Sequence, residues 1–434
     1  MTSLQLHLPF LLVAALGAAP TPTRAAGTSQ AERVAELLLA ARAGERPPDR
    51  TPDDVAALGS VVVPAVVEIV ETRSFPSPGD ERTEVGLRSD EERRLLAALG
   101  RLPHEGVVGH LAELTAGETA PERRRAALAI LGEVGLGPDL PLLARVAGGS
   151  EAGPSVVDRA QFGTSLDRIL GRDPGGVAHA ELAFDAAHDA LLHALVSAVA
   201  EHGGGDGLGV LAGRLGQHPA LDPLLLVHVG RVGATLAPPF HDEVLRRVRG
   251  YLNGRDYELI LIATHTVGQL DDAGSVPELL RLLDDPMPAV PKKAVETLQA
   301  LTGERIGLNP SRWNAWFEAE QEWWAKEASQ QLSRIVHGPP AEATDLLMRV
   351  ARHRLYRHEV ARSVCDALKR PEPDLVYLAC STLGYLKSWT VLPELHACLE
   401  DRAPKVREAA ARAIQVITGM RPGPELTALL AQRG

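Results

Sequence analysis

The sequence predicts an all-α fold, an α-solenoid of stacked antiparallel helical hairpins. Leucine and alanine dominate a chain of 434 residues that is 45% apolar, and its charged positions are mainly Arg, Glu and Asp, a composition typical of helices. A long segment recurs later in the chain, and each copy has the periodicity of two amphipathic helices. We therefore expect almost no sheet.

The recurring segment is residues 258–303, which align without a gap to residues 374–419. Of the 46 aligned positions, 16 are identical. A third copy lies in residues 126–146, and residues 57–70 are a fainter one. Self-similarity of this kind is typical of repeat architectures, in which each repeat is one supersecondary unit.

Each copy predicts one helical hairpin. In the first helix apolar residues recur at steps of three and four, and a glycine, Gly268 or Gly384, is expected to close the last turn. A proline, Pro277 or Pro393, then supplies the preset φ of a first helical position. A single hairpin cannot bury both of its apolar faces, so neighbouring hairpins have to stack against it.

The stretch LEDRAPKVREAAARAI, residues 399–414, resembles the HEAT-repeat family, including the HEAT-like repeats of bilin lyases. The resemblance extends over residues 31–434 and implies a HEAT-like α-solenoid. In HEAT repeats an aspartate and a basic residue at this spacing tie successive hairpins together, and the resemblance assigns that role to Asp401 and Arg407. HEAT arrays serve unrelated functions, so the resemblance indicates the fold and not the activity.

Composition and repeat similarity divide the chain. The parts are a signal peptide and short linker in residues 1–26, N-terminal HEAT-like repeats with loop insertions in 31–257, and C-terminal HEAT-like repeats in 258–434. The C-terminal part includes a Trp-rich helix, 310–330. Residues 72–90 and 148–176 are rich in Gly, Pro, Ser and charge, and we expect at least parts of them to be exposed loops.

The N-terminus contains an apolar run from Leu8 to Ala19 followed by small residues, a pattern typical of a secretory signal peptide. We expect cleavage between Ala18 and Ala26 and export of the mature protein, periplasmic or secreted. The run is too short to cross a bilayer, which takes about 20 residues, and no later stretch predicts a membrane span.

The remaining motifs do not indicate chemistry. A net charge of −11 argues against nucleic acid as a partner, because nucleic-acid-binding proteins need a coherent basic surface.

EHGGGDG, residues 201–207, contains a string that forms the oxyanion hole in some esterases. The chain lacks the GxSxG turn that this chemistry also needs, so we interpret the string as a hairpin turn. Asp185, Asp189 and His193 recur every four residues on one predicted helix, where a solvated polar stripe is favoured over a metal site. We predict no catalytic residues and no cofactor.

The tryptophans are the first candidate for partner binding. Residues 312–324 hold four of the five, Trp313, Trp316, Trp323 and Trp324. With Phe317 they fall within an arc of about 120° on a helix. Asn309 is the expected N-cap of that helix, with Pro310 in its first turn. A buried wedge between repeats is favoured, and an exposed binding platform is the alternative.

The second candidate is a basic cluster. Arg349, Arg352 and His353 are expected to line one helical face that could contact an acidic partner. The alternative is an ordinary solvated face.

The three cysteines, Cys365, Cys380 and Cys398, match no metal or haem spacing. Buried free thiols are favoured. A bridge between Cys380 and Cys398 is the alternative, since an exported protein can hold a disulfide.

These observations favour a non-enzymatic protein–protein interaction or scaffold protein, which uses the solenoid surface outside the cytoplasm to hold a protein or peptide. The alternative, suggested by the resemblance, is an enzyme or cofactor-handling protein related to the HEAT-like bilin lyases. Such a protein would need a deep pocket lined by His, Cys or carboxylates.

Overall fold

A computed structural model describes most of the chain. It covers residues 29–77, 80–117, 119–149, 153–236, 240–424 and 426–427. The expected signal peptide, residues 1–26, lies outside these residues. Contacts divide the chain into two compact units, Met1–Pro103 and His104–Gly434. The boundary that repeat similarity suggested after residue 257 lies within the second unit, where helices on its two sides pack together.

The first unit contains four helices and a short hairpin among its described residues. The elements are α1 (Gln30–Arg42), α2 (Thr51–Ala56), α3 (Val63–Thr72), β1 (Ser74–Ser77), β2 (Asp80–Gly86) and α4 (Ser89–Leu99). The two strands pair antiparallel, with Phe75 opposite Val85. This hairpin lies in residues 72–90, where composition predicted exposed loops in at least part of the segment and no strands. It is ordered because Phe75 is buried, with the Arg42 guanidinium 5.5 Å from its ring centroid.

The described part of the second unit is entirely helical. Its helices are α5 (His104–Leu114), α6 (Pro121–Val134), α7 (Leu140–Gly148), α8 (Val156–Arg172), α9 (Ala180–Ala186), α10 (Asp189–His202), α11 (Gly204–Arg214), α12 (Asp222–Thr235), α13 (Asp242–Gly250), α14 (Tyr257–Gln269), α15 (Val276–Leu282), α16 (Ala289–Thr302), α17 (Pro310–Trp323), α18 (Ser329–His337), α19 (Pro340–Val350), α20 (Arg357–Cys365), α21 (Pro373–Leu386), α22 (Leu392–Ala397) and α23 (Pro404–Thr418).

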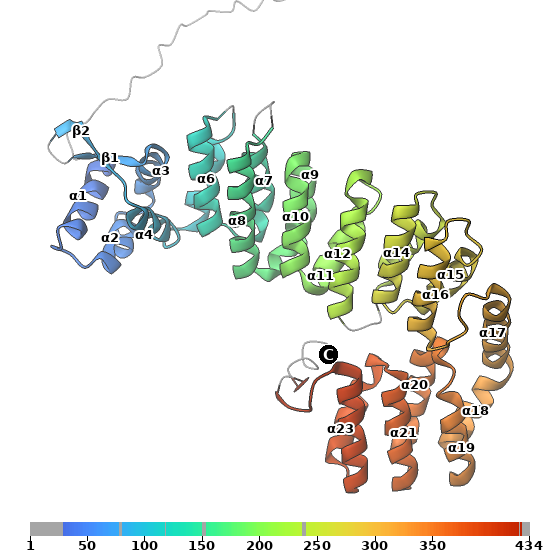
Figure 1. Ribbon diagram of the computed structural model, residues 1–434. Helices are drawn as coiled ribbons and strands as arrows, with labels where there is room; N and C mark the ends of the chain where they lie inside the picture. Colours follow the sequence, from blue (N-terminus) through green and yellow to red (C-terminus); the bar gives the residue numbers. More distant parts are fainter. Residues whose placement is uncertain are drawn as a thin grey trace, which may run out of the picture. The chain divides into compact units, whose positions relative to one another are not determined.

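These helices stack as a HEAT-like α-solenoid of antiparallel hairpins, which confirms the predicted fold class. The first row consists of α6, α8, α10, α12, α14 and α16, and each packs against the next (Figure 1). The alternate helices α7, α9, α11, α13 and α15 form the second row. The first row is interrupted after α16 and resumes with α19, α21 and α23. As predicted, Pro277 and Pro393 lie in the first turns of α15 and α22, the helices that follow α14 and α21.

A glycine marks the closest approach between neighbouring first-row helices. The contacts are Gly132 with Ser165, Gly230 with Thr266, Gly268 with Thr297 and Gly384 with Ala413. A Cβ atom at Gly384 would lie 2.9 Å from the Cα of Ala413, and one at Gly268 would lie 3.1 Å from the Cγ2 of Thr297. Gly268 and Gly384 lie in the last turns of α14 and α21, as predicted, but the C-caps are Leu270 and Lys387. The role of the two glycines is in packing, because the absence of a side chain allows the next helix to approach.

Hydroxyl groups cross the same contacts. Ser165 Oγ donates to the Leu128 carbonyl at 2.7 Å, Thr266 Oγ1 to the Leu226 carbonyl at 3.0 Å, and Thr297 Oγ1 to the Thr264 carbonyl at 3.1 Å. In each case the acceptor lies four residues before the glycine. The carbonyl that already accepts the glycine N–H within the helix thus accepts a second bond from the next helix.

Residues 148–176, expected to be exposed loop at least in part, are mainly helical. Most of the segment is α8, which packs between α6 and α10. Ser155 caps the helix and forms a reciprocal capping box with Asp158, while Phe162, Leu166 and Ile169 are buried. The apolar spacing of these three side chains outweighs the Gly and Ser content around them.

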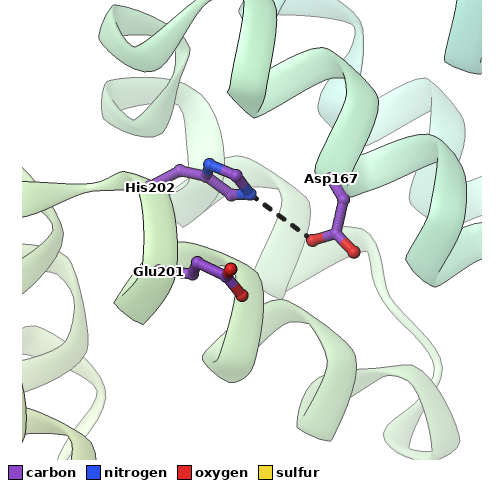
Figure 2. A group of neighbouring side chains, drawn as sticks. All are labelled: Asp167, Glu201 and His202. Carbon is purple, nitrogen blue, oxygen red and sulfur yellow. Dashed lines mark ion pairs between the residues drawn. The ribbon is translucent and has the colours of Figure 1, made fainter.

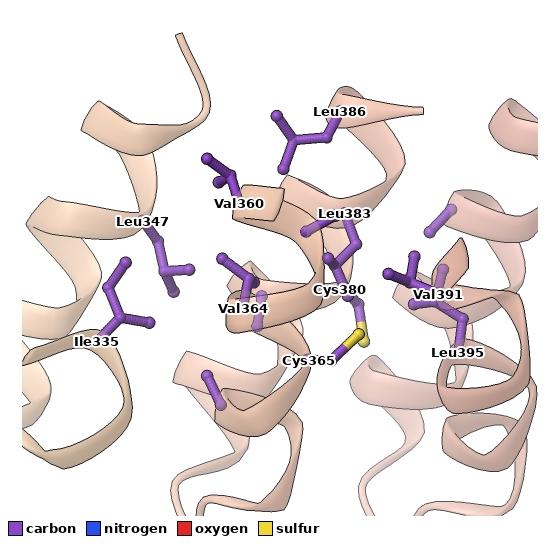
Figure 3. Close-up of a cluster of buried hydrophobic side chains, with 14 of the residues drawn as sticks. Ile335, Leu347, Val360, Val364, Cys365, Cys380, Leu383, Leu386, Val391 and Leu395 are labelled. Atoms are coloured by element: carbon purple, nitrogen blue, oxygen red, sulfur yellow. The ribbon is translucent and has the colours of Figure 1, made fainter. Parts of the chain in front are cut away.

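The last hairpins share an apolar core that includes cysteines. Cys365 and Cys380 lie among Val364, Leu383 and Leu395 (Figure 3). All three cysteines are free thiols in the structure, as favoured from the sequence. Burial raises the pKa of Cys365 to about 12, so this thiol stays protonated at neutral pH.

Among the described residues, no single helix is long and apolar enough to cross a membrane. One pair of neighbouring segments, Pro48–Ala56 and Ser60–Thr72, reaches the required length and composition together. The pair is bent by 105° at the break.

Replacing Gly132 by alanine is expected to lower the free energy of unfolding by about 1–3 kcal/mol. The new Cβ atom would lie 2.9 Å from the Ser165 Cα and force α6 and α8 apart. Gly163→Ala on α8 is the matched control, because no described atom lies within 4 Å of a Cβ there. Its higher helix propensity should add up to about 1 kcal/mol. Denaturant unfolding followed by circular dichroism measures both, and equal stability of the variants would contradict the close-approach role.

Candidate partner-binding surface

The tryptophans lie on α17 and on the irregular turn that follows it. As predicted, the helix begins at Pro310, and the Asn309 side chain caps it by accepting the Arg312 N–H at 3.0 Å. After Trp323 the backbone widens into a π-helical turn, Trp324–Ala328, before α18. A π-turn inserts one extra residue into a helix and so rotates the side chains around it.

The four tryptophans divide into buried and half-buried pairs. Trp313 is fully buried and donates its indole N–H to the Gly307 carbonyl at 2.8 Å, and Trp323 is 6% exposed. Trp316 is half-buried and meets the edge of Trp313 with ring centroids 5.6 Å apart. Trp324 is half-buried as well. The stretch therefore combines a packed wedge with a partly exposed aromatic edge.

The residues His353 and Tyr356 complete an aromatic cluster with Trp323 and Trp324. His353 stacks flat on Trp323, with ring centroids 3.5 Å apart and an angle of 3° between the planes. Tyr356 stacks on Trp324 at 4.4 Å and 11°. The cluster joins the end of α17 to the turn after α19, although the two segments are about one repeat apart in sequence.

Glu320 holds the histidine in this cluster. Its Oε1 lies 2.9 Å from His353 Nδ1, and its side chain is almost completely buried. Burial raises the pKa of the Tyr356 hydroxyl, and the negative charges of Glu320 and Glu359 raise it further. Sequence analysis did not single out Glu320, although it lies on the same arc of α17 as the tryptophans, because its partner His353 is 33 residues away.

The basic cluster does not form one helical face. Helix α19 ends at Val350, so Arg352 and His353 lie in the turn after it. Arg349 and Arg352 are exposed, whereas His353 turns inward to Trp323 and Glu320. The expectation was wrong for His353 because stacking and a hydrogen bond hold it in the aromatic cluster.

Asp401 and Arg407 are in contact, but the acceptor is the backbone carbonyl of Asp401 and not its carboxylate. Arg407 Nη1 donates to the Asp401 carbonyl at 2.9 Å, while the Asp401 carboxylate accepts the Ala403 N–H at 2.8 Å. These bonds close the turn that leads into α23. Elsewhere an arginine joins neighbouring hairpins. Arg249 Nε, on α13, donates to Asp272 Oδ2, in the turn before α15, at 2.6 Å.

The proposed polar stripe of Asp185, Asp189 and His193 is not on one helix. The chain breaks between α9 and α10, with Asp185 on the first and Asp189 at the start of the second. Asp185 instead accepts from Arg214 Nη1 at 2.5 Å. The structure does not bring these three residues together as a site.

The EHGGGDG string forms the turn between α10 and α11, as predicted. Gly203 follows the last residue of α10, and Gly204 has a φ of +48°. A Cβ atom at Gly203 would lie 2.6 Å from the Cα of Gly207. The glycines are thus required by the tight turn.

Residues 361–433 match the family of HEAT repeats. No curated protein sequence matches the chain. Among solved structures, Kap95p bound to RanGDP is 13% identical, with 93% of this chain and 57% of Kap95p covered and a TM-score of 0.33. Importin beta is 11% identical, with 85% and 54% covered and a TM-score of 0.32. An engineered protein is 13% identical, with 91% and 100% covered and a TM-score of 0.22. The chain thus spans little more than half the length of Kap95p and importin beta.

Tryptophan fluorescence distinguishes the wedge from the edge. In a Trp389→Phe background, which leaves only the tryptophans of this segment, the double variant Trp316→Phe, Trp324→Phe should emit further to the blue and resist acrylamide, because Trp313 and Trp323 are buried. The converse variant, Trp313→Phe, Trp323→Phe, should emit further to the red and quench more readily. Equal quenching of the two variants would show that the segment is uniformly buried or uniformly exposed.

Proposed function

We propose that this protein is a non-enzymatic interaction protein that holds a protein or peptide outside the cytoplasm. The stacked hairpins present an extended surface, as solenoids do through the small rotation between repeats. The match of residues 361–433 to HEAT repeats agrees with such a role.

The observation that supports this proposal most directly is the aromatic edge of α17 with the arginines near it. Trp316 and Trp324 are each held on one side by another ring and keep part of their surface exposed. Arg352 adjoins His353 of the aromatic cluster, and Arg349 lies one turn earlier. Tryptophan, tyrosine and arginine are the residues that most often dominate binding energy at protein interfaces.

The chemistry of this surface favours a partner with acidic side chains beside an apolar anchor. Arg349 and Arg352 are exposed cations in a chain with a net charge of −11. An acidic peptide would meet repulsion over most of the protein and attraction here, which gives orientation as well as affinity. An apolar side chain of the peptide would cover the half-buried indole rings.

Affinity capture tests this surface. The bait is the full mature chain, incubated with the extracellular fraction of the source cells and analysed by quantitative mass spectrometry. The double variant Arg349→Ser, Arg352→Ser should recover the partner at least about tenfold less well, the loss expected when interface arginines are truncated.

The matched control is Arg159→Ser, Arg255→Ser, which removes two exposed arginines from other hairpins of the same unit. It should recover the partner like the wild type. Equal recovery by the two double variants would overturn the role of Arg349 and Arg352. A purified protein that carries a visible chromophore would instead favour the cofactor-handling alternative.

Export is the second part of the proposal and has its own test. Mass spectrometry of the protein from the periplasm or the medium should find a new N-terminus created by cleavage between Ala18 and Ala26. Leu12→Arg places a charge in the apolar run and should keep the uncleaved chain inside the cell. An intact N-terminus on the wild-type protein in the cytoplasm would refute export.

A further inference from the structure

Three potential metal ligands converge where α8 and α10 lie side by side. Asp167 comes from α8, and Glu201 and His202 are the last two residues of α10. One ligand atom from each side chain lies within 4.8 Å of the other two. Figure 2 shows the imidazole ring directed at the Asp167 carboxylate, with Glu201 beside them. The ring lies over Gly171 of α8, where a Cβ atom would be in ordinary contact with His202 Cε1 at 3.8 Å.

The distance between the His202 nitrogen and the Asp167 oxygen suits two ligands of one metal ion better than a direct hydrogen bond. His202 Nε2 and Asp167 Oδ1 are 3.6 Å apart, beyond the usual length of an N–H···O hydrogen bond. Two ligands of a tetrahedral zinc ion, each with a bond of about 2.0–2.1 Å, lie about 3.4 Å apart. The two atoms are therefore about as far apart as two ligands of the same metal ion.

The charges around the group favour a cation. Glu201 lies at the C-terminal end of α10, where the helix dipole disfavours negative charge. The nearby arginines of α8 face α6 instead: Arg168 lies 3.6 Å from Glu133, and Arg172 donates to the Gly132 carbonyl at 2.8 Å. Within the described part of the chain, neither Asp167 nor Glu201 has an ion pair with lysine or arginine.

We propose that Asp167, Glu201 and His202 bind a divalent transition-metal ion such as Zn²⁺. One imidazole nitrogen and two carboxylate oxygens are a donor set that zinc accepts, and water fills the remaining position. Both carboxylates are exposed, so Glu201 can swing towards the ion without disturbing the core. The ion links two consecutive first-row helices and so stabilises one junction of the solenoid.

Isothermal titration of Zn²⁺ into the full mature chain, freed of metal with EDTA, tests the site. Loss of even an outer-shell partner weakens metal sites about 10- to 100-fold, so His202→Ala and Asp167→Asn should each weaken binding at least about tenfold. The wild type should bind one ion per chain at this site. Zinc should also raise its thermal midpoint and leave that of His202→Ala unchanged.

His104→Ala is the matched control. His104 Nε2 lies 3.0 Å from Asp139 Oδ2, a direct contact that leaves no room for an ion between the two atoms. It belongs to no three-ligand group among the described residues. The control should bind zinc like the wild type. Unchanged zinc affinity in both His202→Ala and Asp167→Asn, or no binding by the wild type, would overturn the proposal.

Discussion

The close approach of neighbouring first-row helices at a glycine is the contact on which the second unit depends. Without a Cβ atom at Gly132, Gly230 or Gly268, a hydroxyl of the next helix reaches the carbonyl four residues earlier. Each such bond contributes about 1 kcal/mol and, more importantly, fixes which turn of one helix faces which turn of the next. The identity of Gly268 and Gly384 in the two aligned copies thus reflects packing between repeats and not the end of a helix.

The interruption after α16 shows how the unit continues where that contact is missing. Arg357, almost fully buried, donates to the Leu301 carbonyl at 2.7 Å and forms an ion pair with Asp271, which lies before α15. One side chain at the start of α20 thus ties the last helices to α16 and to the turn after α14. The Trp-rich segment occupies the chain between these anchors, so its aromatic cluster packs against a turn and not against a regular helix of the first row.

Local patterns predicted the elements, and non-local contacts decided the rest. The helical hairpins, the Asn309 cap and the glycine turn after α10 follow from short-range signals that the sequence displays. The β-hairpin and α8 were missed because Gly, Pro and Ser content suggested loops. In the hairpin the buried residue Phe75 stands alone among polar residues, and in α8 the apolar spacing that begins at Phe162 was outweighed by that composition. The pairing of Glu320 with His353, and of Asp167 with His202, joins residues more than 30 positions apart, and no periodicity within one helix could reveal it.

Packing and the proposed partner binding involve different atoms of the Trp-rich segment, so mutation can separate them. Trp313 and Trp323 fill the interior and would cost stability if removed, so a loss of partner binding in such variants would not identify a contact. Trp316, Trp324, Arg349 and Arg352 keep exposed surface, and their replacement changes what a partner meets more than what the core contains. Trp323 is buried and Trp324, the first residue of the π-turn, is half-buried, so two consecutive indole rings lie at different depths against the same turn. A surface built in this way holds its aromatic groups rigid before a partner arrives, and rigid anchors lose less conformational entropy on binding than flexible ones do.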